Sequence, residues 1–180
     1  MNETDLRVIK TRESIENAFL SLVLQKPLKK ITIVELAREA RINKGTFYLH
    51  YSDISDLYMQ TIHKQIKASF ESADYFDDFF DDPKKFCDEL NATFSHNLPT
   101  MEALAQDRGT SFMQPQTLDT LREKVYATGR IKRCVTNDMK LDALFGALLV
   151  CHPRYEAEHS LEMNQLMISM ISHFHADCCE

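Results

Sequence analysis

Four polar side chains in one short segment have the chemistry needed to contact a nucleic acid. They are Lys44, Thr46, Tyr48 and His50. Ammonium, hydroxyl and imidazole groups donate hydrogen bonds to phosphate oxygens or to the edges of bases in a groove. In a helix, Phe47 and Tyr51 would share the inward face, because they lie four residues apart. The segment is therefore predicted to be a short helix with one polar face and one buried face.

A second short helix is predicted just before this segment, because apolar residues follow the i, i+3, i+4, i+7 spacing of a helix face. They are Ile33, Leu36, Ala37 and Ala40. Thr32 can cap the start of this helix, and Glu35 completes a capping box. Asn43 offers the N-cap for the segment that follows. Two short helices joined by a turn are typical of a helix-turn-helix, although they also occur in many other helical proteins.

Longer helices are predicted on both sides of this pair. The first runs from Asp5 to about Gln25, with an apolar face of Ile15, Ala18, Phe19 and Leu22, and Pro27 ends it. The second begins after Ser52 or Asp53 and runs to about Ala73. Its apolar positions are Leu57, Ile62, Ile66 and Phe70. The short helices are therefore expected to pack between two long ones.

Residues 31–51 read ITIVELAREARINKGTFYLHY and resemble the DNA-binding motif of the TetR family of bacterial transcriptional regulators. The family's Thr-x-x-x-Leu-Ala start matches Thr32, Leu36 and Ala37. Its Lys-Gly-Thr-Phe-Tyr-x-His-Tyr segment matches residues 44–51. With the flanking helices, the resemblance covers about residues 7–70. It implies a regulator that binds a palindromic operator in double-stranded DNA.

The resemblance also implies which side chains touch the operator. They are Thr32, Asn43, Lys44, Gly45, Thr46, Tyr48 and His50. Thr32 would meet a phosphate at the start of the first motif helix. Lys44 would donate to a guanine edge or a phosphate, and Tyr48 and His50 would contact the backbone or flanking bases.

Two departures from the family pattern predict differences in the motif. Arg41 replaces the glycine that is common in the turn, which predicts a less tight turn. The start of the second long helix, residues 52–56, lacks the lysine that often touches phosphate and carries two aspartates instead. Lysines elsewhere could supply the missing positive charge. They are Lys10, Lys29 and Lys30.

Composition and charge support this division of the chain. With four glycines and five prolines in 180 residues, an all-α fold is more consistent than a β-sandwich or a glycine-rich nucleotide fold. The formal charge is −6, which by itself disfavours nucleic-acid binding. It is uneven, however: residues 1–67 carry 11 basic and 8 acidic side chains, and residues 68–180 carry 10 and 19. The basic third coincides with the motif.

The predicted architecture is an N-terminal three-helix DNA-binding domain over residues 7–70, followed by a helical effector-binding and dimerisation domain over residues 71–180. No phosphate-binding loop or hydrolase motif is present, so no enzymatic activity, cofactor or metal is expected. The absence of a targeting segment, and of an apolar stretch near 20 residues, predicts a cytoplasmic protein with no membrane contact. The five cysteines are odd in number and lack the spacing of a disulfide framework, so they are expected to stay reduced.

Two apolar helices near the C-terminus predict a homodimer with a four-helix interface, although the same helices could instead close the core of one chain. The predicted interface residues are Leu141, Leu144, Phe145, Leu148, Met163, Met167, Met170 and Phe174. Reading a two-fold operator favours the dimer, because two recognition helices must meet successive major grooves.

A pocket for a small-molecule effector is expected between the middle helices. Side chains of these types are more often core than pocket, and the candidates are Phe94, Met101, Phe112, Met113, Tyr126 and Phe145. The function predicted is a repressor that a ligand releases from its operator. One alternative is a helical interaction module with weak or no DNA binding. The other is a metal or thiol sensor that uses a C-terminal cluster, namely His173, His175, Cys178 and Cys179.

Overall fold

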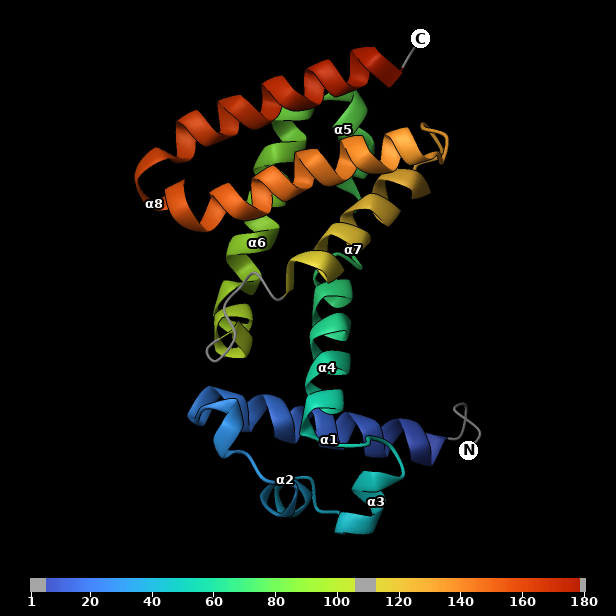
Figure 1. Ribbon diagram of the computed structural model, residues 1–180, viewed down its shortest axis with the longest axis vertical. Coiled ribbons are helices and arrows are strands. Elements are labelled where there is room, and N and C mark those ends of the chain that lie inside the picture. Colours follow the sequence, from blue (N-terminus) through green and yellow to red (C-terminus); the bar gives the residue numbers. More distant parts are fainter. Residues whose placement is uncertain (1–5, 106–112, 179–180) are drawn as a thin grey trace. The chain divides into compact units, whose positions relative to one another are not determined.

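A computed structural model describes residues 6–105 and 113–178, and every regular element within these ranges is helical, as the predicted all-α class requires. The side chains of residues 98, 152–157 and 175–178 lie outside this description. The elements in chain order are α1 (Leu6–Gln25), η1 (Leu28–Lys30), α2 (Ile33–Glu39), α3 (Lys44–Tyr48), α4 (Ile54–Ser69), η2 (Tyr75–Asp77), α5 (Asp78–Asp81), α6 (Pro83–Ala105), α7 (Gln114–Ala127) and α8 (Val135–Cys178) (Figure 1).

The described chain divides into two compact units. Unit 1 contains residues 6–65 and 99–105, and unit 2 contains residues 66–98 and 113–178. Helices α4 and α6 contribute residues to both units. Within the described ranges, no helix is both long and apolar enough to span a membrane.

The last turns of α6 pack in unit 1 because a buried tyrosine of α4 holds them. The Tyr58 hydroxyl donates to the backbone carbonyl of Leu104 at 2.7 Å. The Tyr58 ring in turn meets Phe19 of α1 edge to face, with ring centres 6.3 Å apart. The compact units thus do not coincide with the predicted segments 7–70 and 71–180. Whether those segments act as separate domains stays a prediction.

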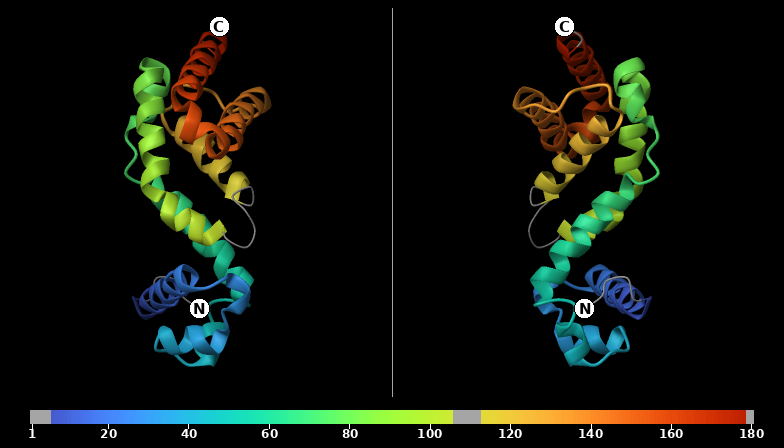
Figure 2. Two further views of the ribbon diagram at one scale, coloured as in Figure 1. Left: turned by 90° about the vertical axis from the view of Figure 1, so that its left-hand side faces the viewer. Right: turned by 90° about the vertical axis from the view of Figure 1, so that its right-hand side faces the viewer.

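Unit 1 is built around the apolar faces of α1, α2, α3 and the first turns of α4. Figure 2 shows the ribbons of α1, α2 and α3, in blue to cyan, grouped together. Its fully buried side chains include Ile15, Phe19, Leu36, Phe47, Tyr51, Leu57, Tyr58 and Ile62. Seven of these lie on the apolar faces that the sequence predicts, or on the predicted inward face at Phe47 and Tyr51, and Tyr58 is the addition. Burial of this face fixes α3 on the unit and leaves its polar side outward.

Unit 2 is built around aromatic rings from η2 and α5 that pack against α6 and α8. Phe79 lies at the centre of this cluster, with ring centres 5.2 Å from Phe86, 5.5 Å from Phe174 and 6.1 Å from Phe145. The kink in α8 lies at His159, whose φ of −134° and ψ of 33° are not helical. The first arm (135–158) and the second arm (160–178) of α8 therefore run in different directions (Figure 1).

Candidate nucleic-acid interface

The first helix of the motif begins where the sequence predicts. The Thr32 hydroxyl oxygen accepts a hydrogen bond from the Glu35 amide at 3.3 Å and caps α2. The Glu35 carboxylate forms an ion pair with Lys26, which ties the start of α2 to the end of α1. Thr32 itself is exposed, so its hydroxyl lies at the surface of unit 1.

The turn between α2 and α3 is tight, and the predicted loosening at Arg41 is wrong. Arg41 has a φ of +56°, which places a non-glycine residue in the left-handed region. The Ile42 amide donates to the Ala37 carbonyl at 2.9 Å, and the Arg41 amide donates to the Arg38 carbonyl at 3.1 Å. These two bonds form a Schellman motif, which usually has glycine at the position of Arg41. The arginine adopts the glycine conformation at a cost of about 1–2 kcal/mol.

Asn43 closes the start of the recognition helix α3. Its side-chain oxygen Oδ1 accepts from the Thr46 amide at 2.7 Å and from the Thr46 hydroxyl at 3.0 Å. A Cβ atom added at Gly45 would lie 3.2 Å from this oxygen, which is a tight contact, so glycine gives the cap the room it needs. Asn43 and Thr46 thus use these polar atoms to hold the helix in place.

Lys44 and Tyr48 form the outward face of α3. They are one helical turn apart, and the Lys44 ammonium nitrogen lies 5.9 Å from the centre of the Tyr48 ring. Tyr48 is 50% exposed, while its neighbour Phe47 is fully buried and meets it edge to face at 5.5 Å. Tyr48 therefore presents half of an aromatic ring and a hydroxyl next to a positive charge. This combination can contact phosphate, sugar and base edges.

His50 follows α3 and is half-buried beside Tyr51. Burial, and secondarily the positive charge of Arg12, lower its pKa below the usual 6.5. The imidazole is therefore neutral near pH 7 and would contact DNA as a hydrogen-bonding group rather than as a cation.

A buried carboxylate holds the end of residues 44–51, the recognition segment, which contains α3 and the three residues after it. Glu16 of α1 accepts a hydrogen bond from the Tyr51 hydroxyl at 3.0 Å, and its other oxygen pairs with the Lys64 ammonium at 2.5 Å. Burial raises the pKa of Tyr51 to about 12, so its hydroxyl remains a donor. Sequence periodicity does not predict this network, because Tyr51 and Lys64 lie 35 and 48 residues from Glu16 in the chain.

The start of α4 is closed by its own carboxylates. Asp53 Oδ1 accepts from the Asp56 amide at 2.8 Å, and Asp56 Oδ2 accepts from the Ser52 amide at 2.9 Å. The other Asp56 oxygen accepts from Gln60, whose amide oxygen accepts from Arg12 at 2.6 Å. Hydrogen bonds from Ser52 and Gln60 lower the pKa of Asp56. This helix terminus is therefore unsuited to hold a phosphate.

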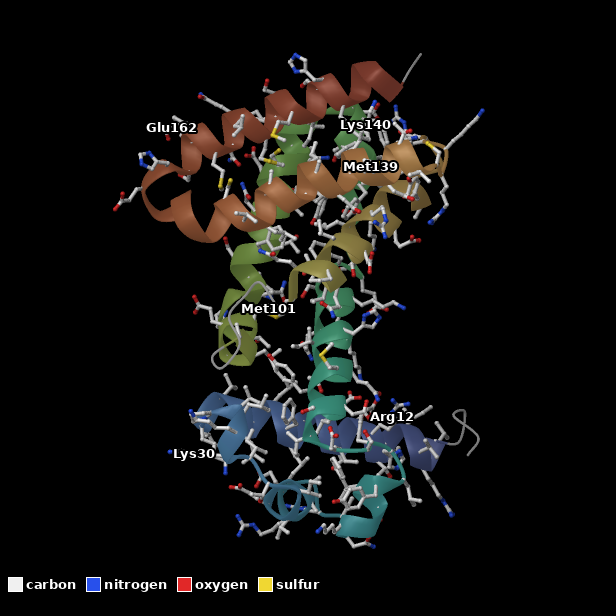
Figure 3. The ribbon with its side chains drawn as sticks, viewed as in Figure 1. Arg12, Lys30, Met101, Met139, Lys140 and Glu162 are labelled. Carbon is white, nitrogen blue, oxygen red and sulfur yellow. The ribbon has the colours of Figure 1, made fainter. Side chains whose placement is uncertain are left out.

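The three lysines proposed to compensate lie at the surface of unit 1. Lys10 is exposed on α1, and Lys29 and Lys30 are exposed in η1. Lys30 is labelled in Figure 3, where it extends from the connection between α1 and α2. Their contacts with DNA stay a prediction.

The candidate ligand residues divide by burial. Phe94 and Met101 of α6 are half-buried, whereas Met113, Tyr126 and Phe145 are buried, and Phe112 lies outside the described residues. The Tyr126 hydroxyl donates to Asp138 at 2.9 Å, and burial together with that carboxylate raises its pKa to about 12. Phe145 packs against Phe79. These two rings are tied into the core of unit 2, which leaves Phe94 and Met101 as the more accessible candidates.

The predicted dimer residues lie mostly in the core of a single chain. Leu141, Leu144, Phe145, Leu148, Met163, Met167 and Phe174 are at most 7% exposed, and Met170 is half-buried. Side chains that are buried within one chain have little surface left for a second copy. The face of α8 that is free to meet a partner is therefore a different one.

Exposed apolar side chains occur on both arms of α8, at Leu161 and Leu166 on the second arm and as a continuous face on the first. Val135 is 74% exposed, Met139 is 68% exposed and Val150 is 41% exposed. Ala143 and Gly146 fall between them on the same side of the helix, and a Cβ atom added at Gly146 would meet nothing within 4 Å. Met139 is labelled in Figure 3.

The cluster proposed for metal or thiol sensing lies largely outside the described side chains. His173 is described, and its ring nitrogen Nδ1 lies 2.7 Å from the Ser169 carbonyl, whereas His175, Cys178 and Cys179 are not. Among the side chains that are described, no group of three or more His, Cys, Asp or Glu residues could hold a metal ion.

Part of the chain is similar in sequence to a known transcriptional regulator. A scan against models of protein families finds no match. Over 63 residues the chain is 35% identical to YxbF, an uncharacterised HTH-type transcriptional regulator of Bacillus subtilis (strain 168). The match spans 34% of this chain and 17% of that protein.

A crystal structure from Mesorhizobium loti MAFF303099, of a protein assigned to the TetR family of transcriptional regulators, resembles nearly the whole chain. The TM-score is 0.53 and the sequence identity 17%, with 96% of this chain and 98% of the other covered. The similarity at this identity concerns the fold, and it agrees with the family resemblance of the motif. The chain therefore has the all-helical fold of TetR-family transcriptional regulators, with a helix-turn-helix formed by α2 and α3.

Proposed function

We propose that this protein regulates transcription by binding a palindromic operator as a homodimer, with α3 as the recognition helix. The observation that carries the proposal is the outward face of α3, where Lys44 and a half-exposed Tyr48 lie together above the buried Phe47. A helix held by its buried face and by the Asn43 cap can enter a major groove without rearrangement.

Selection of duplexes from a random pool, followed by affinity measurements on the selected site, tests this proposal. Lys44→Ala and Tyr48→Ala are each expected to weaken binding by roughly 10-fold or more, because a good base or phosphate contact contributes about 1–3 kcal/mol. Lys132→Gln, at an exposed position of unit 2, removes the same charge outside the motif and serves as the control. Failure of the wild-type protein to select any duplex would instead favour the interaction module.

We propose that the second copy in this dimer covers the free face of the first arm of α8. Val135, Met139 and Val150 expose apolar surface there, and Gly146 leaves room for another helix to approach closely. Met139→Glu should shift the protein from dimer to monomer in sedimentation or light scattering. Met170→Glu, at the position where the sequence predicts the interface, is the comparison variant. If Met139→Glu remains dimeric, this face is not the interface.

The regulator is proposed to act as a repressor that a small, planar and apolar ligand releases from DNA. Phe94, half-buried on the part of α6 that belongs to unit 2, is the proposed contact of that ligand. A library of such compounds can be screened for those that raise the thermal unfolding midpoint, because a ligand that binds only the folded state stabilises it. A hit that does not release the operator, or that binds Phe94→Ala equally well, contradicts this part of the proposal.

A further inference from the structure

The turn of the helix-turn-helix carries a cation where its backbone geometry favours glycine. Arg41 has a φ of +56°, and within the described residues it is the only non-glycine residue with a positive φ. Strained backbone conformations of this kind cluster at active sites and ligand-binding sites, where they contribute to function. The Schellman bonds of Ile42 and Arg41 show that the surrounding turn enforces the conformation.

The Arg41 side chain is free to bind a ligand. It is exposed, and within the described part of the chain its guanidinium makes no hydrogen bond, ion pair or ring contact. Arg38 and Lys44 are exposed on either side of it, and Glu39 is the only acidic residue between them in the sequence. The turn therefore carries a net charge of +2 over residues 38–44, from three cations and one carboxylate.

The turn also has a defined place in the motif. In a helix-turn-helix the N-terminal residues of the recognition helix contact base edges, while the first helix crosses the phosphate backbone. Arg41 lies two residues before the Asn43 cap, at the junction of these two regions. A long guanidinium side chain at this junction can reach the phosphates that border the groove, where its fork of donors matches the phosphate oxygens.

The starts of α4 and α3 offer less to a phosphate than the turn does. The start of α4 is closed by Asp53 and Asp56, whose carboxylates accept its amide hydrogen bonds and would repel an anion. At the start of α3, the Asn43 side-chain oxygen already accepts the hydrogen bond of the Thr46 amide. The phosphate contact that these helix starts do not supply can come from the turn.

We propose that Arg41 is a phosphate anchor: its guanidinium binds the DNA backbone at the edge of the major groove that α3 enters. The inference rests on the proposed DNA binding and assigns it a contact that the family motif, with glycine in the turn, does not have. Because a phosphate contact carries no sequence information, Arg41 should contribute equally to operator and unrelated duplexes.

Three variants separate charge from backbone strain. Arg41→Gly removes both, Arg41→Asn removes the charge but tolerates the left-handed conformation, and Arg41→Lys keeps the charge without the fork. Arg41→Gly should raise the thermal unfolding midpoint by about 2–4 °C, because glycine relieves the strain. A variant that is more stable and yet binds DNA less tightly cannot owe the lost affinity to unfolding.

The measurement is the salt dependence of affinity for a mixed-sequence duplex of about 30 base pairs, long enough for two half-sites one helical turn apart. Each phosphate contact contributes about 0.9 to the slope of log K against log salt, so two copies of Arg41 contribute about 1.8. Between about 50 and 200 mM salt, Arg41→Gly and Arg41→Asn should therefore lose roughly 10-fold less affinity than wild type. Arg41→Lys should keep the slope with weaker binding.

Lys132→Gln is the matched control, because it removes one positive charge from an exposed position in unit 2. If Arg41→Asn has the affinity and slope of Lys132→Gln while Lys44→Ala still weakens binding, the anchor is refuted and the proposed DNA binding stands. If wild type binds no duplex at any salt concentration, both proposals are refuted together.

Discussion

The two compact units of this chain are stabilised by different chemistry. In unit 1 the buried Glu16 carboxylate joins three helical segments through directional bonds to Tyr51 and Lys64. In unit 2 the corresponding role falls to ring packing around Phe79, which meets aromatic side chains of α6 and of both arms of α8.

The difference matters for what each unit has to do. Hydrogen bonds to a buried charge have strict geometry, so they fix the segment that ends the recognition helix in one position. Aromatic contacts tolerate several ring orientations, and the pairs around Phe79 include both edge-to-face and tilted arrangements. Unit 1 therefore favours a single defined surface, and unit 2 favours a core that can adjust.

The largest expected effect comes from removing the centre of the aromatic cluster. Phe79→Ala should lower the free energy of unfolding by about 3–5 kcal/mol, because it deletes a fully buried ring and leaves a cavity. Urea denaturation followed by circular dichroism measures the loss. Phe79→Leu, which retains most of the volume, should lose clearly less. A loss of less than about 1 kcal/mol for Phe79→Ala would show that burial of the ring does not hold unit 2 together.

A matched pair of tyrosines tests the polar half of the comparison. Tyr51 donates to Glu16 at 3.0 Å in a buried site, and Tyr126 donates to Asp138 at 2.9 Å beside a half-exposed carboxylate. Tyr51→Phe should cost about 1.5–3 kcal/mol of unfolding free energy, and Tyr126→Phe about 0.5–1 kcal/mol. The same denaturation experiment compares them. A larger loss at Tyr126 would contradict the view that a buried directional bond stabilises unit 1.

The sequence predicts the motif well because its signals are local. Thr32 and Asn43 cap α2 and α3 as predicted, and the inward positions Phe47 and Tyr51 are buried. The prediction of a less tight turn at Arg41 is wrong. The Schellman bonds donated by the Arg41 and Ile42 amides close the turn, although arginine disfavours the left-handed backbone conformation that this requires. Residue type at one position does not reveal how strongly its neighbours enforce a conformation.

The rest of the site depends on partners that periodicity does not identify. The apolar stripes of α8 are real, but spacing alone does not distinguish a face that packs inside the chain from one that meets a second copy. Leu141, Met163 and Phe174 lie on the inner side, whereas Met139 lies on the outer one. The network of Glu16 is hidden for a related reason, since its members are far apart in the sequence.

The smallest expected effect concerns pH and the recognition segment. Burial and then Arg12 lower the pKa of His50 in the folded protein below its ordinary 6.5. At pH values well above 6.5 the imidazole is neutral in both states and contributes nothing to the pH dependence of stability. At lower pH the unfolded chain binds the proton first, so the free energy of unfolding falls as the pH falls. His50→Gln should therefore lose less stability than wild type between about pH 7.5 and 5.5.

Denaturant unfolding at several pH values measures this difference, with His63→Gln as the control. His63 is exposed on α4, outside the segment that contains His50, so its replacement removes an imidazole and leaves the surroundings of His50 unchanged. The control should follow the wild-type curve. If His50→Gln follows it as well, burial of the His50 ring has no effect on proton binding. The recognition segment would then be less tightly enclosed by α1 than the contacts of Arg12 and Glu16 imply.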